Sequence, residues 1–210
     1  MPAGYKKIEQ TSYEVTSRKH RRLRHHFIAA WLRAPMRIGG VLPSSRALAK
    51  AMAEQVDLSK EGAIIELGAG TGMVTHALVK RRIPKDKLLV IERERPLYDL
   101  LEQSFPDLHL LCADAMNLRK VLNEAGIGKV NAIVSSLPFL TMPNIIRLAI
   151  EEEMARAIGD DGIIIQFTYG HRSPISASEL KRYGLVGVRE KIVLANVPPA
   201  HVWVYRKNNR

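Results

Sequence analysis

A glycine-rich turn with an acidic residue just before it is the part of the sequence best suited to chemistry. Residues 64–72 have the sequence Ile-Ile-Glu-Leu-Gly-Ala-Gly-Thr-Gly, in which an apolar run leads into three alternate glycines. Glycine takes positive φ angles at no steric cost and lets a ligand approach the backbone closely. In open α/β sheets, ligands bind outside the carboxyl ends of the strands, where such turns lie. The candidate ligand-binding residues in this segment are Glu66, Gly68, Ala69, Gly70 and Gly72.

Two further carboxylates follow the next two apolar runs and indicate what the ligand carries. Glu92 ends the run 88–92, where a carboxylate can accept hydrogen bonds from both hydroxyls of a ribose. Asp114 follows the run 109–112 and can accept a hydrogen bond from the amino group of an adenine. Either residue alone could be an ordinary surface carboxylate, but carboxylates at the ends of successive strands favour a nucleoside site. Their neighbours Arg93 and Ala115 are added as candidate contacts.

The spacing of the glycines separates two kinds of nucleoside-binding fold. A dinucleotide-binding turn follows the pattern G-x-G-x-x-G, whereas here the third glycine comes one residue early. An acidic residue at the position of Glu66 is also foreign to that pattern. Both features resemble the first motif of class I S-adenosylmethionine-dependent methyltransferases, whose loop packs against the methionine part of the cofactor. The resemblance implies S-adenosylmethionine as the cofactor and S-adenosylhomocysteine as its product.

Short apolar runs alternate with helical patterns from residue 62 onward. The expected strands are 63–67, 88–92, 109–112, 131–136, 162–168, 186–194 and 202–206, and the expected helices among them are 72–81, 96–105, 118–125 and 143–158. Strand–helix alternation predicts a parallel sheet with helices on both faces. Residues 195–200 are too short for a crossover helix, so the last two strands should pair antiparallel. We therefore predict an α/β, Rossmann-like class I methyltransferase fold, with a seven-stranded, mostly parallel sheet and an antiparallel last strand.

The positive charge is concentrated at the start of the chain. The formal net charge is +11, and residues 1–37 hold nine Lys or Arg against two Glu, a net of +7. Residues 18–34 follow an amphipathic helical pattern, with Phe27 and Trp31 on the apolar face and most arginines opposite. Such a helix is typical of segments that lie on anionic membranes, although its apolar stripe could instead pack on the core. We therefore divide the chain into a basic membrane-association segment, 1–37, and a methyltransferase domain, 38–210.

The same composition bears on the compartment and the partner. No run approaches the roughly 18 apolar residues of a spanning helix, and no apolar stretch follows the first basic residues as in a secretory signal. Cys112 is the only cysteine, which fits a reduced compartment, and its apolar surroundings predict a buried side chain. The basic segment suggests a polyanion partner, either nucleic acid or an anionic lipid surface, and charge alone does not choose between them. The amphipathic helix fits the lipid surface, so we expect a cytoplasmic protein, peripheral on the inner face of the cell membrane, that binds anionic phospholipids rather than nucleic acid.

Several longer segments resemble the bacterial phospholipid N-methyltransferase family. They are residues 31–35 (Trp-Leu-Arg-Ala-Pro), 39–45 (Gly-Gly-Val-Leu-Pro-Ser-Ser), 135–138 (Ser-Ser-Leu-Pro), 166–170 (Gln-Phe-Thr-Tyr-Gly) and 196–203 (Asn-Val-Pro-Pro-Ala-His-Val-Trp). With the glycine loop they reach from the N-terminal helix to the last strand. The resemblance implies methyl transfer from S-adenosylmethionine, with no metal ion, to the amine of phosphatidylethanolamine and its mono- and dimethyl forms, toward phosphatidylcholine.

The residues of these segments supply hypotheses for the acceptor site. Tyr169 is a candidate to contact the amine, and His171 is a candidate base or phosphate ligand. Arg172 could bind a phosphate, although it and His171 could equally belong to a solvated loop. Tyr13 would join an aromatic cage if the N-terminal segment folds over the site. We assign Ser135 and Ser136 to cofactor binding, and Ser44, Ser45, Leu137 and Phe139 to substrate binding.

The alternative is a ribosomal RNA adenine-N6 dimethyltransferase, which has a similar fold and would also explain the basic charge. The fourth-strand motif of those enzymes resembles Asn-Leu-Pro-Tyr, whose amide accepts from the adenine amino group and whose ring stacks on the flipped base. Here residues 136–139 are Ser-Leu-Pro-Phe, so an aromatic ring is present and the amide is absent. Those enzymes also carry a helical RNA-binding domain after the sheet, for which we expect no room in this chain.

Overall fold

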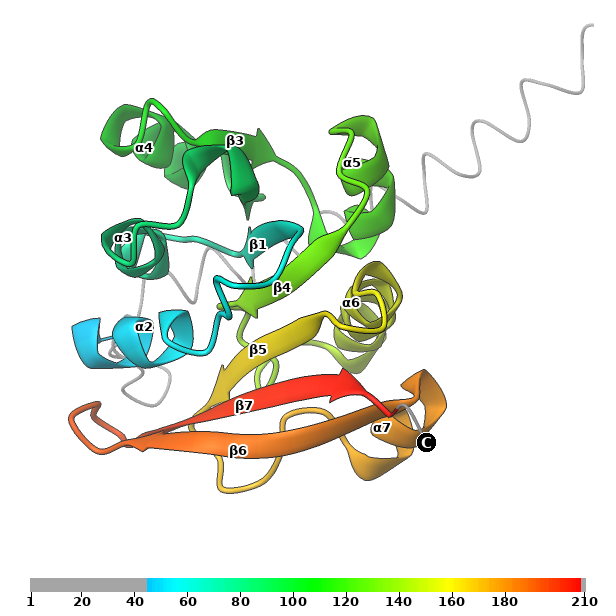
Figure 1. Ribbon diagram of the computed structural model, residues 1–210. Helices are drawn as coiled ribbons and strands as arrows, with labels where there is room; N and C mark the ends of the chain where they lie inside the picture. Colours follow the sequence, from blue (N-terminus) through cyan, green and yellow to red (C-terminus); the bar gives the residue numbers. More distant parts are fainter. Residues whose placement is uncertain (1–44, 209–210) are drawn as a thin grey trace, which may run out of the picture. The chain divides into compact units, whose positions relative to one another are not determined.

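The computed structural model describes residues 45–208, which form a seven-stranded sheet with helices on both faces (Figure 1). The strands are β1 (Ala63–Leu67), β2 (Leu88–Glu92), β3 (His109–Cys112), β4 (Val130–Ser135), β5 (Ile163–Thr168), β6 (Leu185–Val193) and β7 (Ala200–Lys207). The helices are α2 (Arg46–Ala53), α3 (Met73–Lys80), α4 (Arg95–Ser104), α5 (Leu118–Glu124), α6 (Asn144–Ala157) and α7 (Ala177–Tyr183), with short 3-10 helices η1 (Lys85–Lys87) and η2 (Ala115–Asn117).

The strand order is β3-β2-β1-β4-β5-β7-β6, and it confirms the predicted sheet. Strands β1 to β5 run parallel, while β7 lies between β5 and β6 and is antiparallel to both. The order reverses between β1 and β4, and ligands of open α/β sheets bind in the crevice at such a reversal. The fold therefore directs attention to the loops that follow β1 and β4.

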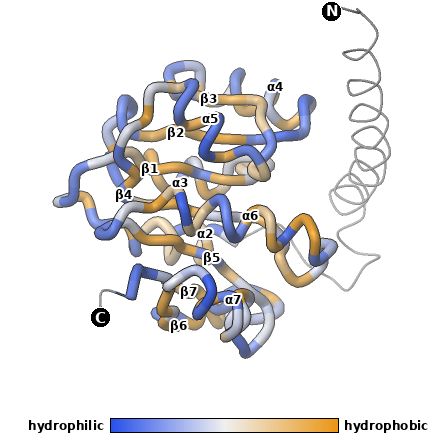
Figure 2. The backbone as a smooth tube through the Cα atoms, turned by 90° about the vertical axis from the view of Figure 1, so that its right-hand side faces the viewer, coloured by the Kyte–Doolittle hydropathy of each residue, from blue (hydrophilic) through white to orange (hydrophobic). Residues whose placement is uncertain are grey.

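Two apolar layers, one on each face, hold the sheet between the helices. Ile64 and Ile65 are neighbours in β1, but Ile64 packs with α2, α3 and α4, whereas Ile65 packs with α5 and α6. Both faces of β1, β2, β4 and β5 are buried along their whole length, as expected for parallel strands covered on two sides. Figure 2 accordingly shows β1 and β2 in hydrophobic colours. A strand with two buried faces gives the sheet edge a rigid base on which loops can place ligands.

Local signals explain most element boundaries. Helix α2 begins after Ser45, whose hydroxyl caps it by accepting a hydrogen bond from the N–H of Leu48 at 3.2 Å. Helix α7 was not predicted, although Ser176 caps its start and Gly184, at φ +63°, ends it. Only Leu180 and Tyr183 pack against the core, and both are only partly buried, so this seven-residue helix offers too short an apolar pattern for a periodicity argument to detect.

The expected burial of Cys112 is wrong, because the side chain is exposed. It lies on β3, which is the edge strand of the sheet and has no neighbour beyond it. An apolar run on an edge strand is only half covered, which the sequence pattern does not reveal. The predicted amphipathic segment 1–37, Tyr13 and Ser44 lie outside the described residues, as does the expected domain boundary.

Within residues 45–208, no helix combines the length and the apolar character needed to cross a bilayer.

Candidate functional site

The loop after β1 has the backbone conformation that only glycine adopts easily. Gly68, Gly70 and Gly72 have φ angles of +69°, +59° and +83°. A Cβ atom on Gly70 would meet nothing closer than the carbonyl oxygen of Gly68 at 4.0 Å, so this part of the loop faces open space. A Cβ atom on Gly72 would lie 2.8 Å from the ring of Phe105, so this glycine lets the chain pack closely against α4. The loop is therefore tightly packed at Gly72 and open to a ligand at Gly70.

Glu92, at the end of β2, anchors this loop. Its Oε2 accepts a hydrogen bond from the N–H of Gly70 and its Oε1 accepts one from the N–H of Glu94, both at 2.8 Å. The side chain is 6% exposed, and burial raises the pKa of its carboxyl, with the Glu94 and Gly70 amides offsetting part of the effect. Each carboxylate oxygen can still accept a second hydrogen bond, so Glu92 can hold the loop and bind hydroxyls at the same time.

Glu66 lies beneath the loop and not on its surface. Its side chain is fully buried, and the groups that can hydrogen-bond to its carboxyl are the hydroxyl and the backbone N–H of Thr75. Burial raises the pKa of Glu66 to about 8, with Thr75 as the main opposing influence. The carboxyl is therefore largely protonated at neutral pH, and the structure encloses it where the sequence predicts a ligand contact.

Asp114 and Arg93 join the loops after β2 and β3. The Asp114 carboxylate caps η2 by accepting from the N–H of Met116 at 3.0 Å. The Arg93 guanidinium lies 2.7 Å from the Glu94 carboxylate and 3.9 Å from that of Asp114. Asp114 is 24% exposed at its side chain, and Ala115 is nearly buried at 8%. The predicted residues Glu92, Arg93 and Asp114 thus lie at the ends of adjacent strands.

The loop after β4 packs directly against the glycine loop. The N–H of Ser136 donates to the carbonyl of Leu67 at 2.9 Å, and a Cβ atom on Gly68 would lie 2.6 Å from Leu137. Ser135 is fully buried, and the Ser136 hydroxyl is buried without a partner among the described residues. The loop after β1 and the loop after β4 are therefore in direct contact, with Gly68 against Leu137.

Gln166 holds the loop after β4 in place. No role was predicted for this residue from the sequence. Its side chain is fully buried on β5, and its Nε2 donates to the carbonyl oxygens of Leu137 at 2.9 Å and Phe167 at 3.1 Å. In the sequence, the signal for such a role is a glutamine in a mainly apolar strand. That signal does not reveal which loop the glutamine bonds to.

The structure does not present Phe139 as a stacking platform. The side chain is 3% exposed and belongs to the core layer on the α5 and α6 face of the sheet. The sequence prediction that an aromatic ring is available here to contact the substrate is therefore corrected. The motif places a phenylalanine at this position, but the side chain turns into the core, where burial of its large apolar surface is more favourable.

The loop after β5 carries the remaining predicted residues. The rings of Tyr169 and Phe167 meet edge to face at 5.4 Å, and burial raises the pKa of the Tyr169 hydroxyl, with Asn196 opposing. His171 and Arg172 are exposed, and the His171 ring lies 5.4 Å from that of His201 at the start of β7. The loop after β5 and the β6–β7 hairpin thus lie together at the sheet edge. Ser45 joins them, since its N–H donates to Asn196 Oδ1 at 3.2 Å.

Charge divides this edge of the sheet into two halves. The carboxylates Glu92, Glu94 and Asp114 lie at the ends of β2 and β3, beside the largely protonated Glu66 of β1. In contrast, loops 136–143, 169–176 and 194–199 contain no Asp or Glu, and the second of them carries His171 and Arg172. These three loops follow β4, follow β5 and join β6 to β7 (Figure 1). We call them the acceptor half of the edge, and the carboxylate-bearing part the cofactor half.

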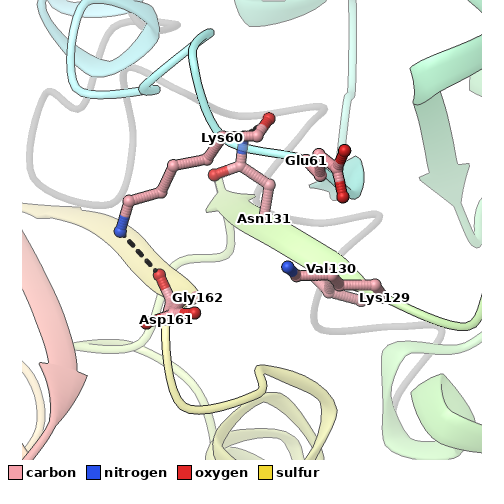
Figure 3. Close-up of a pocket in the computed structure, with 7 residues that line it drawn as sticks. All are labelled: Lys60, Glu61, Lys129, Val130, Asn131, Asp161 and Gly162. Atoms are coloured by element: carbon pink, nitrogen blue, oxygen red, sulfur yellow. Dashed lines mark hydrogen bonds between the residues drawn. The ribbon is translucent and has the colours of Figure 1, made fainter.

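A pocket of about 420 Å³ lies at the opposite edge of the sheet (Figure 3). Its lining includes Lys60, Lys129 and Asn131, which precede or begin β1 and β4, and Lys60 reaches across it to the backbone carbonyl of Asp161 at 3.0 Å. These residues stand at the amino ends of parallel strands, away from the glycine loop. The pocket is therefore separate from the candidate site.

Comparison with protein families gives a match over more than half of the chain. Residues 43–159 match the family described as Ribosomal RNA adenine dimethylase. The chain is 24% identical over 145 residues to an ornithine lipid N-methyltransferase of Singulisphaera acidiphila, covering 68% of this chain and 76% of that protein. It is 26% identical over 160 residues to ribosomal RNA small subunit methyltransferase A of Thermotoga neapolitana, covering 75% of this chain and 56% of that protein.

Among solved structures, the fold resembles that of Burkholderia thailandensis 1,6-didemethyltoxoflavin-N1-methyltransferase, determined with bound 1,6-didemethyltoxoflavin and S-adenosylhomocysteine. The TM-score is 0.65 at 11% sequence identity, and the alignment covers 91% of this chain and 90% of the other. At this identity the likeness extends to the fold alone.

Proposed function

This chain belongs to the ribosomal RNA adenine dimethylase family, a family of S-adenosylmethionine-dependent methyltransferases, and we propose that its acceptor is the amine of a membrane aminolipid. The activity is methyl transfer, and the cofactor is S-adenosylmethionine. Family membership does not identify the acceptor, so the lipid acceptor is our proposal. It follows the resemblance to phospholipid N-methyltransferases, and phosphatidylethanolamine and ornithine lipid are the substrates to test.

The residues of the cofactor half fit this cofactor. Gly70 is half-buried and its Cβ position faces open space, so a ligand can approach the backbone of the loop there. Glu92 keeps acceptor capacity for ribose hydroxyls, and Asp114 stands one strand further along, where an adenine amino group needs an acceptor. The bound cofactor supplies a methyl group that its sulfonium already activates, so the task of the protein is to position the acceptor.

The composition of the loop after β4 is the observation that carries the lipid proposal. An adenine acceptor needs an amide to bind its amino group and an aromatic face to stack its flipped ring. Residues 136–139 offer a serine in place of the amide, and the Phe139 ring is buried in the core. A small alkylamine needs neither group. It needs only backbone acceptors such as the Leu137 carbonyl, which Gln166 holds in place.

The charge of the acceptor half suits an amine that must lose a proton. A primary alkylamine has a pKa near 10.4, and only its neutral form carries the lone pair that attacks the methyl group. A nearby carboxylate would stabilise the ammonium form and slow the reaction. Loops 136–143, 169–176 and 194–199 contain no carboxylate, so they favour the neutral amine. Tyr169 offers a half-buried aromatic face for the methylated cation that forms, and Arg172 offers a charge for a phosphate.

Relatives supply support for both acceptors. The S. acidiphila enzyme is named for a lipid amine, and the match spans 76% of its length. Adenine in ribosomal RNA is the second candidate, because the family and the T. neapolitana enzyme are named for it, although the match spans 56% of that enzyme. We propose a cytoplasmic location on the inner face of the membrane, where the aminolipid head groups are within reach.

A labelling experiment separates the two acceptors. The full chain is incubated with methyl-labelled S-adenosylmethionine and either vesicles containing phosphatidylethanolamine, vesicles containing ornithine lipid, or small ribosomal subunits that lack the adenine methylation. The lipid proposal expects label in the lipid fraction of at least one vesicle sample. A Glu92→Ala variant loses the side chain that anchors the glycine loop. It serves as the control for methylation that depends on the cofactor site, and it should transfer much less label. Label in ribosomal RNA with none in lipid would refute the proposal.

A further inference from the structure

We propose that the catalytic unit itself docks on the lipid bilayer through exposed apolar side chains on the acceptor half of the sheet edge. We call this set the apolar rim, and it consists of Leu140, Ile145, Leu194 and Val197. The inference rests on the proposed lipid substrate and adds the surface that brings the site to it. It is separate from the basic segment 1–37, which lies outside the described residues.

The members of the rim are the most exposed large apolar side chains of residues 45–208. Leu140 is 60% exposed, Ile145 and Val197 are 71% exposed, and Leu194 is 75% exposed. Every other large apolar side chain described as exposed lies between 42% and 48%. Single exposed apolar side chains are ordinary, but their concentration at one functional edge marks an interaction surface.

Contacts between the acceptor loops place the rim around the candidate acceptor site. Leu140 belongs to the loop after β4 and Ile145 to the first turn of α6, directly after that loop, while Leu194 and Val197 belong to the β6–β7 hairpin. The sheet order β4-β5-β7-β6 puts the loop after β5, with Tyr169, between these two pairs. The ideal Cβ position of Gly170 is 3.7 Å from Leu140, which joins the first two loops.

On the other side, the ring contact between His171 and His201 joins the loop after β5 to the hairpin strand β7. Figure 1 shows the ends of β4 and β5 and the β6–β7 hairpin on the same side of the sheet. The rim therefore flanks the acceptor site on both sides.

Charge and reaction geometry favour a bilayer as the occupant. The rim loops carry no carboxylate, and the exposed Arg172 and His171 stand between them, which suits an anionic lipid surface. Methyl transfer requires the reacting atoms to approach within about 3–3.5 Å, while the amine of a bilayer lipid stays at the head-group level. The surface around the acceptor site must then touch the interface, where apolar tips can enter the acyl boundary.

Flotation with vesicles tests the rim directly. The full chain is mixed with vesicles of phosphatidylethanolamine and phosphatidylglycerol, and bound protein is measured after centrifugation. A Leu140→Ser/Leu194→Ser variant removes one leucine from each side of the site. Burying a leucine is worth about tenfold in partitioning, so we expect vesicle binding to fall at least about tenfold. The matched control is Leu58→Ser/Leu100→Ser, in which the leucines are 42% and 44% exposed on other parts of the unit, and it should bind as the wild type does.

Activity on detergent-dispersed phosphatidylethanolamine separates failure of the rim from failure of the proposed function. If the rim docks on membranes, Leu140→Ser/Leu194→Ser methylates dispersed lipid at the wild-type rate and vesicle lipid more slowly. If that variant floats with vesicles as well as the wild type does, the rim proposal is wrong while lipid methylation stands. If the wild type methylates ribosomal RNA and neither lipid form, the proposed function is wrong.

Two other occupants of the rim give distinct results without vesicles. A lower melting temperature of Leu140→Ser/Leu194→Ser than of the leucine control would mean that residues 1–44 of the chain cover the rim. A change from an oligomer to a smaller species in analytical ultracentrifugation would mean that a second copy covers it. Either result would overturn the bilayer proposal, since the rim would then be occupied by protein.

Discussion

Replacing Glu66 by Gln should remove a pH-dependent loss of stability that the buried carboxyl imposes on the fold. Glu66 is fully buried under the glycine loop, where only Thr75 offers its carboxyl hydrogen bonds. Burial raises the pKa of this carboxyl from 4.5 to about 8. Between these two pH values the folded state keeps the proton and the unfolded state has lost it. Each rise in pH therefore favours unfolding.

The size of the effect follows from the shift. One pKa unit corresponds to about 1.36 kcal/mol, so the full shift from 4.5 to about 8 amounts to about 4–5 kcal/mol. The free energy of unfolding of the wild type should fall by about 3–4 kcal/mol between about pH 5 and about pH 8 through this residue alone. Glutamine has nearly the same shape and stays neutral, so the variant should gain that amount over the wild type at about pH 8 and little at about pH 5.

Urea unfolding at several pH values measures the difference. Glu61→Gln, at an exposed position, changes the net charge by the same amount and serves as the control. The wild type and Glu61→Gln should lose stability in parallel as the pH rises, while Glu66→Gln loses less. Glu151, whose pKa is raised to about 7 by burial, adds to the slope in all three proteins and cancels in the comparison. Parallel profiles for the wild type and Glu66→Gln would refute the reasoning.

Four further outcomes are expected. Gly70→Ala and Gly126→Ala both place alanine at positive φ and should each cost about 1–2 kcal/mol of stability, because a Cβ atom at either position meets no atom closer than 4.0 Å. Only Gly70→Ala should weaken S-adenosylmethionine binding in calorimetry, since Gly126 lies between α5 and the amino end of β4, away from the glycine loop. Glu92→Gln should weaken cofactor binding about tenfold or more, because the amide is a poorer acceptor for the ribose hydroxyls of the cofactor and for the N–H of Gly70. Tyr169→Ala should lower lipid methylation about tenfold with cofactor affinity unchanged, and equal turnover would remove Tyr169 from the site. Methylation of lipid should rise about tenfold per pH unit between about pH 6 and about pH 8, as the amine loses its proton, and a flat profile would contradict an amine acceptor.

Periodicity and strand–helix alternation were sufficient to predict the sheet. Every expected strand forms, within two residues of its predicted ends, because parallel strands with two buried faces require long apolar runs that stand out in the sequence. The antiparallel pairing of the last two strands followed from the short link between them. Helix α7 escaped prediction because it is short and only Leu180 and Tyr183 pack partly against the core. The burial of Cys112 was predicted wrongly because an apolar run does not reveal whether its strand lies at the edge.

The sequence predicted those parts of the candidate site in which the residue type itself dictates the backbone geometry, as glycine does in a tight turn. The positive φ angles of Gly68 and Gly70 and the position of Glu92 follow from spacing along a strand–turn–helix segment. Side-chain direction does not follow from spacing, so the enclosed positions of Glu66 and Phe139 came from the structure. The contact of Gln166 with Leu137 joins residues far apart in the sequence, and only the fold brings them together.

The division of the sheet edge explains why family membership leaves the acceptor open. The family match spans residues 43–159, which include all of the cofactor half and the loop after β4. The loop after β5 and the β6–β7 hairpin, which form most of the acceptor half, lie beyond it. A shared cofactor half constrains the donor and its activation, which are common to amine and adenine acceptors. The acceptor must then be decided by the loop after β4, where Ser136 replaces the amide and Phe139 is buried, together with residues 160–208, whose loops beside the site lack carboxylates and expose Leu194 and Val197. Those properties suit a neutral amine at an apolar interface better than a polyanion, whose binding depends on an array of cationic contacts.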